Sequence, residues 1–320
     1  MLAYIIRRIL LSIPVLIGVS LITFFLTQVG GDPVRIMMGQ HADKDVIAQI
    51  RHELHLDEPL WKQYLYFLHD FFTGKLRSFK TKRPVWDHLK ERFPYTLSLA
   101  ILSIIIATII GVSAGIISAV KRGSWFDNLA MLASMIGIST PVYLIGLVFI
   151  LLFIKKLGWI HGVGVWDAWL EVDLGSIVVQ IWFPLCILLP AITLGAQPAA
   201  FIARITRSSM LEVVKQDYIR TARAKGVPER EVVLKHALRN ALIPVITVLG
   251  LEFAYLLGGA VLTETVYAWP GLGTMAVQAF RDRDIPMIQG TVLFIAFTFV
   301  FMNLIVDVLY SWIDPRIRYD

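Results

Sequence analysis

Residues 96–120 read TLSLAILSIIIATIIGVSAGIISAV, a run of 25 residues that contains no charged side chain. A helix rises about 1.5 Å per residue, and the hydrocarbon core of a bilayer is roughly 30 Å thick. This run is therefore long enough and apolar enough to cross a membrane, and it predicts a transmembrane helix.

The rest of the chain repeats this pattern. Its 320 residues are 57% hydrophobic and 17% charged, with a mean hydropathy of +0.68, whereas soluble domains carry about 25% charged residues. Further spans are predicted near residues 9–29, 129–154, 181–203, 242–262 and 288–312. The expected fold is all-α: a polytopic membrane helical bundle of about six transmembrane helices. The first apolar run is too long for a signal peptide and is interpreted as an uncleaved span.

The distribution of Lys and Arg predicts the orientation. If the N-terminus lies inside the cell, the segment between the fourth and fifth spans also lies inside, and nine Lys or Arg residues fall between Arg204 and Arg239. Cytoplasmic segments of membrane proteins carry such an excess. Both termini are therefore expected in the cytoplasm. The net charge of +6 is attributed to this membrane orientation, and no nucleic acid is expected as a partner.

Two long loops divide the chain. Residues 1–29 form a short cytoplasmic tail and the first span, and residues 30–95 are expected to form a small extracytoplasmic helical lobe. Within that lobe, 43–56 and 59–72 show the periodicity of amphipathic helices. Residues 96–320 make up the core transmembrane domain.

The loop at 204–241 lies inside that core domain, on its expected cytoplasmic side. Ser209 and Glu212 fit a capping box, which predicts a helix start. Gly226 is placed to end that helix, and Pro228 to begin another. A basic helix–Gly–Pro–helix unit can bind DNA, face anionic lipid, or dock a cytoplasmic partner. Two flanking spans tether it closely, which disfavours DNA.

The sequence of this loop carries a family resemblance. Residues 218–226, YIRTARAKG, followed by 236–244, HALRNALIP, resemble the coupling signature of bacterial ABC importer permeases. The version is closest to the family that transports dipeptides, oligopeptides and nickel. The general signature begins Glu-Ala-Ala; here Arg220-Thr-Ala222 stands in its place, as in the peptide-transporting members. Residues 269–273, WPGLG, match as well, whereas 74–78, GKLRS, departs from the family's turn.

The resemblance implies the partners and the location. One such chain forms half of a pore, with a homologous second permease, two cytoplasmic ATPase subunits and an extracytoplasmic substrate-binding protein, in the lipid of a bacterial inner membrane. The sequence contains no Gly-x-x-x-x-Gly-Lys-Ser/Thr phosphate loop. ATP and magnesium are therefore expected on the partner ATPases. This chain itself is expected to be no enzyme, with no catalytic residue, cofactor or metal.

Two sets of candidate site residues follow. Glu252 is ionisable within a predicted span, which makes it a functional candidate, and the resemblance adds Trp269, Pro270 and Gly271 to the translocation path. The resemblance also implies contact between one ATPase and the loop, with these coupling residues: Asp217, Tyr218, Arg220, Thr221, Ala222, Arg223, Lys225 and Gly226.

The substrate stays open at this level. Short peptides are favoured, but nickel and glutathione importers share the architecture. Five of the seven histidines lie in the lobe, and His52 and His55 are spaced to share a helix face. Outside this class, a passive channel or the membrane anchor of a sensor is the alternative. A membrane enzyme is disfavoured, because the spans lack a catalytic constellation.

Overall fold

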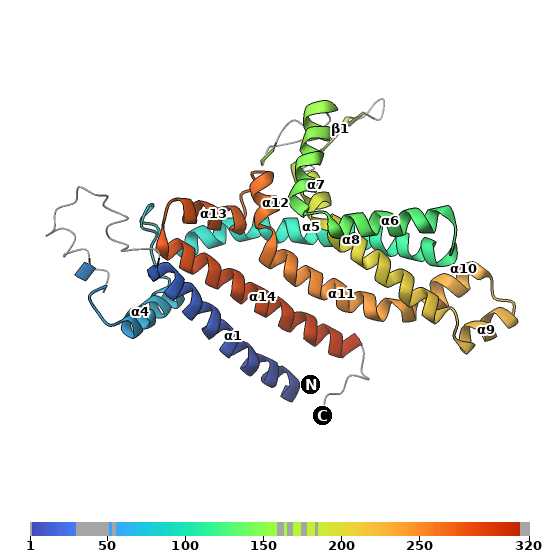
Figure 1. The fold of residues 1–320 in the computed structure, drawn as a ribbon, viewed down its shortest axis with the longest axis horizontal. Helices are drawn as coiled ribbons and strands as arrows, with labels where there is room; N and C mark the ends of the chain where they lie inside the picture. Colours follow the sequence, from blue (N-terminus) through green and yellow to red (C-terminus); the bar gives the residue numbers. More distant parts are fainter. Residues whose placement is uncertain are drawn as a thin grey trace. The chain divides into compact units, whose positions relative to one another are not determined.

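The computed structural model describes residues 2–29, 51–52, 56–158, 163–164, 169–173, 178–182 and 185–313. Figure 1 shows a chain built almost entirely of helices. They are α1 (Leu2–Val29), α4 (Leu60–Thr73), α5 (Val85–Val120), α6 (Trp125–Ser139), α7 (Val142–Phe149), the π-helix η1 (Ile150–Lys156), α8 (Leu185–Val213), α9 (Asp217–Ala224), α10 (Glu229–Glu231), the π-helix η2 (Val232–Ala237), α11 (Leu238–Gly259), α12 (Val261–Val266), α13 (Leu272–Arg281) and α14 (Ile285–Ile313). The predicted all-α fold class is confirmed.

Five helical segments are long and apolar enough to cross a membrane, or six if one bent pair counts as a span. The prediction of a single helix over 129–154 is wrong, because α6 and the α7–η1 arm meet at 107°. Thr140 adopts an extended backbone (φ −88°, ψ 127°). The ring of Pro141 disfavours the helical conformation for the residue before it, and here α6 ends at Ser139 and the helix restarts after the proline.

Several predicted boundaries also move. Helix α5 starts at Val85, well before the predicted residue 96, and α8 starts at Leu185 and runs on to Val213. The helix start predicted at Ser209 is therefore wrong, since Ser209 lies inside α8. Met210, beside it, is fully buried among apolar side chains. Packing of this turn outweighs the local preference of serine for a cap.

A short hairpin was not predicted from the sequence. Strands β1 (Trp169–Asp173) and β2 (Val178–Trp182) pair antiparallel, with Trp169 opposite Trp182. Residues 181–182, assigned to the fourth span from hydropathy, therefore belong to this hairpin. Alternating Val, Ile and Trp give this segment the composition of a strand as well as of a span.

The chain divides into two compact units. We call residues 2–96 with 270–301 the lobe unit, and residues 97–269 with the end of α14 from Met302 the core unit. In the core unit, α5 approaches α8 very closely. A Cβ on Gly111 would lie 2.7 Å from the Ala199 carbonyl oxygen, and one on Gly115 would lie 2.6 Å from Thr206 Cβ. Small residues spaced by four allow such contact between helices.

The lobe unit has its own apolar core. The amphipathic helix predicted over 59–72 is confirmed as α4, which ends at Gly74 in the left-handed conformation (φ +75°). Its buried side chains, Phe67 and Phe71, pack in one cluster with Leu89 of α5 and Leu293 of α14. The other amphipathic helix, predicted over 43–56, lies largely outside the described residues.

Candidate functional site

The turn that joins α8 to α11 forms the expected helix–Gly–Pro–helix unit. Helix α9 ends at Ala224, Gly226 follows with φ +78°, and Pro228 precedes α10 and η2. Gly226 ends a helix and Pro228 precedes the next one, as predicted, but the helix that Gly226 ends starts at Asp217 and not at Ser209. We call residues 216–231 the elbow; Figure 1 shows α9 and α10 beyond the ends of α8 and α11 within the core unit.

One face of the elbow is buried. Ile219 is fully buried and packs with Met210 at the end of α8 and with Val232 and Val233 at the start of η2. Ala222 is partly buried against the same cluster. One apolar cluster therefore contains residues of α8, α9 and η2, so α9 is packed against the helices on both sides of it.

The opposite face of α9 is exposed. The predicted coupling residues Asp217, Tyr218, Arg220 and Thr221 are exposed on α9, and Lys225 is exposed directly after the helix ends. Arg220 and Asp217 form an ion pair of 3.6 Å with both side chains largely in solvent, and Tyr218 Oη accepts a hydrogen bond of 2.7 Å from Asn240 Nδ2. The exposed face is therefore polar and mainly basic, and it leaves Arg220 and Lys225 accessible to a partner.

Arg223 closes the turn across Gly226. Its Nε and one terminal nitrogen donate to the two Glu229 carboxylate oxygens at 3.0 and 2.6 Å. These hydrogen bonds raise the pKa of Arg223 above its ordinary value. A bidentate pair fixes geometry as well as adding energy. The pair therefore holds the end of α9 and the start of α10 at one separation.

Replacing Arg223 by Gln should loosen the elbow without unfolding the protein. The pair is solvent-exposed, so we expect a loss of stability of no more than about 1 kcal/mol. Amide hydrogen exchange at residues 224–228 should become faster. Arg230→Gln is the matched control, since Arg230 is exposed and forms no ion pair within the described part of the chain. Equal acceleration in both variants would contradict the role of the pair.

A buried ion pair, missed in the sequence, connects α6 to α8. Arg207 donates from Nε and a terminal nitrogen to the Asp127 carboxylate at 2.7 and 2.8 Å, and Gly123 N–H donates to the same carboxylate at 3.0 Å. The Asp127 side chain is only 3% exposed. Ser124, three residues earlier, caps α6 by accepting from Asp127 N–H. Ser-x-x-Asp before an apolar run is a capping signature that was available in the sequence.

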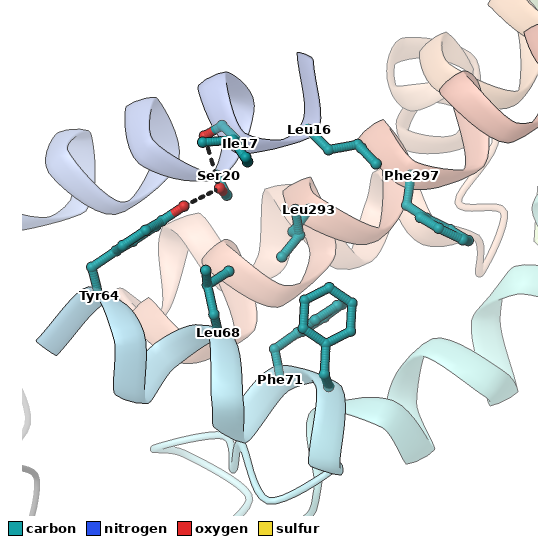
Figure 2. A pocket seen from close by; sticks show the side chains of 9 residues that line it. Leu16, Ile17, Ser20, Tyr64, Leu68, Phe71, Leu293 and Phe297 are labelled. Atoms are coloured by element: carbon teal, nitrogen blue, oxygen red, sulfur yellow. Dashed lines mark hydrogen bonds between the residues drawn. The ribbon is translucent and has the colours of Figure 1, made fainter. Parts of the chain in front are cut away.

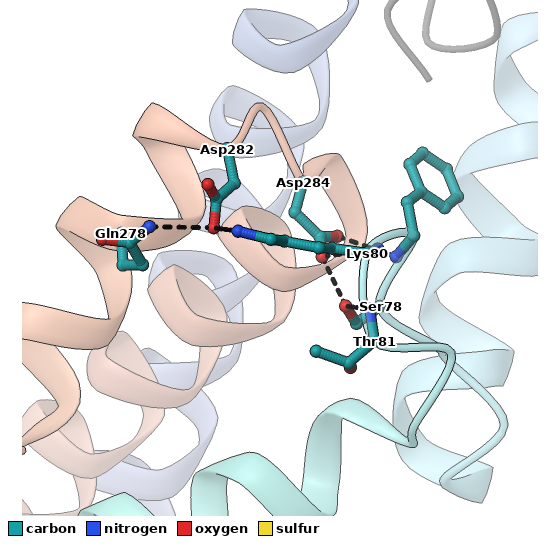
Figure 3. A network of polar contacts seen from close by, with 7 residues as sticks. Ser78, Lys80, Thr81, Gln278, Asp282 and Asp284 are labelled. Carbon is teal, nitrogen blue, oxygen red and sulfur yellow. Dashed lines mark hydrogen bonds and ion pairs between the residues drawn. The ribbon is translucent and has the colours of Figure 1, made fainter. Parts of the chain in front are cut away.

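A second buried carboxylate organises the lobe unit (Figure 3). Asp284 accepts hydrogen bonds from Ser78 Oγ and from the backbone N–H groups of Phe79 and Lys80 at 3.0 and 3.2 Å. It also caps α14 by accepting from Met287 N–H at 3.3 Å. The loop that departs from the family's turn is thus fixed to the α13–α14 corner. No sequence pattern pairs residues about two hundred positions apart.

Asp282 adds a surface contact to the same corner. Lys80 Nζ lies 2.7 Å from its carboxylate and Gln278 Nε2 donates to it at 3.0 Å. Both hydrogen bonds lower the pKa of Asp282 below its ordinary value of 3.8. A carboxyl group whose pKa is lowered on folding stabilises the structure above its ordinary pKa, and this contribution is lost as the pH falls through the lowered value.

Hydrogen exchange in the 78–84 peptide should therefore show a pH dependence. After correction for the intrinsic effect of pH on exchange, we expect the amides of this peptide to be protected at pH 5. Part of this protection should be lost below about pH 3.8, the ordinary pKa of the Asp282 carboxyl. In Asp282→Asn this pH-dependent loss of protection should be absent. The neighbouring Asp284 carboxyl faces the same loop, so a pH-dependent loss of equal size in the variant would refute the role of Asp282.

The candidate path residues do not form one cluster with the elbow. Glu252 is half-buried in α11. Trp269 is buried in a cluster that includes Phe253, the residue that follows Glu252 in the sequence. Pro270 and Gly271 belong to the lobe unit, where the Pro270 carbonyl accepts from Arg92 at 3.3 Å. The elbow residues pack in a different apolar cluster.

Only some histidines can be placed. His41 and His55 lie outside the described residues, and His52, His69 and His88 lie within them. His88 Nε2 is 2.9 Å from Thr81 Oγ1, and His69 Nδ1 is 3.2 Å from Asp70. Within the described ranges, no group of three His, Cys, Asp or Glu side chains is placed to hold a metal ion.

Residues 111–319 match the family described as binding-protein-dependent transport system inner membrane component, and residues 1–100 match its N-terminal membrane component. The chain belongs to this family of ABC importer permeases.

Over the full length of both chains, it is 44% identical to the dipeptide transport system permease protein DppB of Alkalihalophilus pseudofirmus and 44% identical to the glutathione transport system permease protein GsiC of Escherichia coli K12. The fold resembles two inward-facing structures of the MetNI methionine ABC transporter. Their TM-scores are 0.56 and 0.57 at 18% and 17% identity, covering 71% of this chain and 96% of theirs.

Proposed function

We propose that this permease imports short peptides. One relative that is 44% identical is a dipeptide permease and another is a glutathione permease; glutathione is itself a tripeptide. The two substrates share a free ammonium group, free carboxylates and amide bonds. We therefore infer that the pathway of this permease accepts di- and tripeptides, and nickel is the less favoured alternative.

The elbow is the proposed docking point for a cytoplasmic ATPase. Its two-faced construction supports this role: Ile219 ties one face to α8 and η2, whereas Arg220 and Lys225 stand exposed on the other face. The exposed basic side chains suit acidic residues in a groove of the partner. Hydrolysis of ATP, with its magnesium, would take place on two such ATPase subunits, and this chain would supply no catalytic group.

The proposed assembly follows from that docking point. This chain would pair with a homologous second permease and receive substrate from a binding protein on the opposite side of the bacterial inner membrane. Both termini and the elbow would then be cytoplasmic, and the lobe unit would carry the extracytoplasmic loops. The nine Lys and Arg residues between Arg204 and Arg239 support this orientation.

Glu252 is the proposed counter-charge for the peptide ammonium group. Its carboxylate is half-buried within a candidate span and forms no ion pair or side-chain hydrogen bond among the described residues. An ionisable group at this depth is costly unless it meets water or an opposite charge. Trp269, Pro270 and Gly271 would shape the path on the binding-protein side.

Uptake by the complete transporter in proteoliposomes tests the proposal. With the binding protein and ATP present, labelled dialanine should accumulate, and an excess of unlabelled glutathione should compete with it. Omitting ATP should abolish accumulation. Uptake of nickel with no uptake of dialanine would overturn the peptide assignment. Entry of dialanine without ATP, up to equal concentrations on both sides, would favour a passive channel.

A further inference from the structure

A small apolar cavity opens on the surface of the lobe unit between α1, α4 and α14 (Figure 2). Its volume is about 100 Å³. Phe71 and Leu293 form its buried floor, whereas Phe72 and Phe297 are 70% and 47% exposed and stand at its mouth. Leu68 of α4 is half-buried and also lines the cavity.

The polar atoms at this cavity are already satisfied. Ser20 Oγ donates to the Ile17 carbonyl at 2.8 Å, so in its 2.7 Å contact with Tyr64 Oη it acts as the acceptor. The hydroxyl protons of Ser20 and Tyr64 are thus both used within the protein. A cavity without a free donor and lined by Leu, Ile and Phe stays dry and favours apolar occupants, as an engineered cavity of about 150 Å³ that binds benzene does. A peptide or an ion has nothing to bind here.

Two walls of the cavity belong to candidate membrane spans. Ile17 lies near the middle of the 6–27 span, and Phe297 lies near the middle of the 285–308 span. Residues at the middle of a span lie at the depth of the hydrocarbon core. The medium outside the mouth is therefore the acyl chains of the bilayer, and lipid head groups lie farther out.

The third wall carries its own apolar surface. On α4, Trp61, Leu65 and Phe72 are 62%, 53% and 70% exposed. They recur at helical spacing on the side turned away from the buried Phe67 and Phe71. An exposed apolar face of this kind marks a contact with a membrane or with another protein. Because the other two walls belong to candidate spans, lipid is the medium that suits all three.

We propose that this cavity binds the end of one acyl chain of a bilayer phospholipid, inserted between Phe72 and Phe297. The chain would complete the packing of α4 against α1 and α14. Methylene groups match the lining, which within the described residues offers no charge. The bound chain would be a resident lipid, exchanging more slowly than those that contact the rest of the surface.

A photoreactive lipid tests this proposal. The transporter, co-expressed with its partner chains, is placed in liposomes of phosphatidylethanolamine and phosphatidylglycerol that contain a phosphatidylcholine with a diazirine at the end of one acyl chain. Cross-linked residues are mapped by peptide mass spectrometry. Because a cavity encloses more of its ligand than an open surface does, labelling at Leu68, Phe72 and Phe297 should exceed that at the exposed α1 residues Leu10 and Ile22 at least about fivefold.

A matched pair of variants separates the cavity from the surface. Leu68→Trp fills the cavity and should remove most of the excess labelling, whereas Leu65→Trp, on the exposed face of the same helix, should leave it unchanged. If Leu68→Trp does not assemble, the smaller change Leu68→Phe should still halve the excess. Labelling at the cavity no stronger than at Leu10 would overturn the proposal. So would protection of the cavity residues by a partner protein.

Discussion

Gly226→Val should uncouple ATP hydrolysis from uptake while the protein is still made and inserted. Gly226 has φ +78°, and no heavy atom lies within 4 Å of the position that a Cβ would occupy. The substitution therefore causes no clash; its cost is the left-handed backbone, about 1–2 kcal/mol for a residue with a side chain and more for a β-branched one. The chain can relieve this strain only by changing the angle between α9 and α10.

A changed angle would misplace the exposed face of α9 on its proposed partner. We expect uptake to fall at least about tenfold, within the usual range of coupling free energies, while ATP hydrolysis by the assembled transporter continues. Gly226→Asn should retain most of the uptake, because asparagine tolerates the left-handed conformation. Uptake of labelled dialanine and release of phosphate are measured on the same proteoliposomes.

The control for Gly226→Val is a glycine with the same backbone elsewhere. Gly158 has φ +65° and also has no atom near its missing Cβ, but it lies at the end of the η1 arm. Gly158→Val imposes similar strain away from the elbow and should leave uptake near that of the wild type. Equal losses in the two variants would show a general defect, and normal uptake by Gly226→Val would rule out the coupling role.

Arg207→Leu should destabilise the protein more than any other single change considered above. It leaves the Asp127 carboxylate, 3% exposed, with Gly123 N–H as its remaining donor within the described structure. Breaking a buried ion pair costs about 3–5 kcal/mol. The lower end applies here, because the Arg207 side chain is 26% exposed and water can partly replace it.

Thermal unfolding of the purified transporter in detergent measures this effect. The double variant Asp127→Leu/Arg207→Leu should recover much of the loss, because it removes the uncompensated charge. Arg220→Leu is the control: its pair with Asp217 is 3.6 Å long and exposed on both sides, so its removal should cost at most about 1 kcal/mol. If Arg207→Leu unfolds at the same temperature as Arg220→Leu, the pair does not stabilise the α6–α8 contact.

The sequence predicted those features that depend on local chemistry. Gly226 and Pro228 determine their own backbone conformation wherever they stand, so the elbow could be predicted in order and nearly in register. The regular apolar face over 59–72 likewise gave α4. The prediction at Ser209 was wrong because a capping serine contributes only about 1 kcal/mol. The burial of Met210, the next residue, stabilises the continued helix by more than this.

The features that could not be predicted are contacts between distant segments. Asp284 bonds to Ser78 across about two hundred residues, and Asp127 to Arg207 across eighty. Each of these residues looks like an ordinary charge or cap until the helices are packed. Hydropathy also predicted one span across the break at Pro141, because it counts apolar residues and does not register the direction of a helix axis.

That break has a consequence for how the protein is made. Each arm, 125–139 and 142–156, contains 15 residues, which gives a length of about 22 Å as a helix. Neither arm alone reaches across a hydrocarbon core of about 30 Å. During synthesis the insertion machinery therefore cannot release the first arm as a finished span. We therefore expect the two arms to enter the bilayer as one unit. Gln197 of α8 donates a hydrogen bond to the Thr140 carbonyl at 2.9 Å, so this carbonyl gains its partner only once α8 has been made.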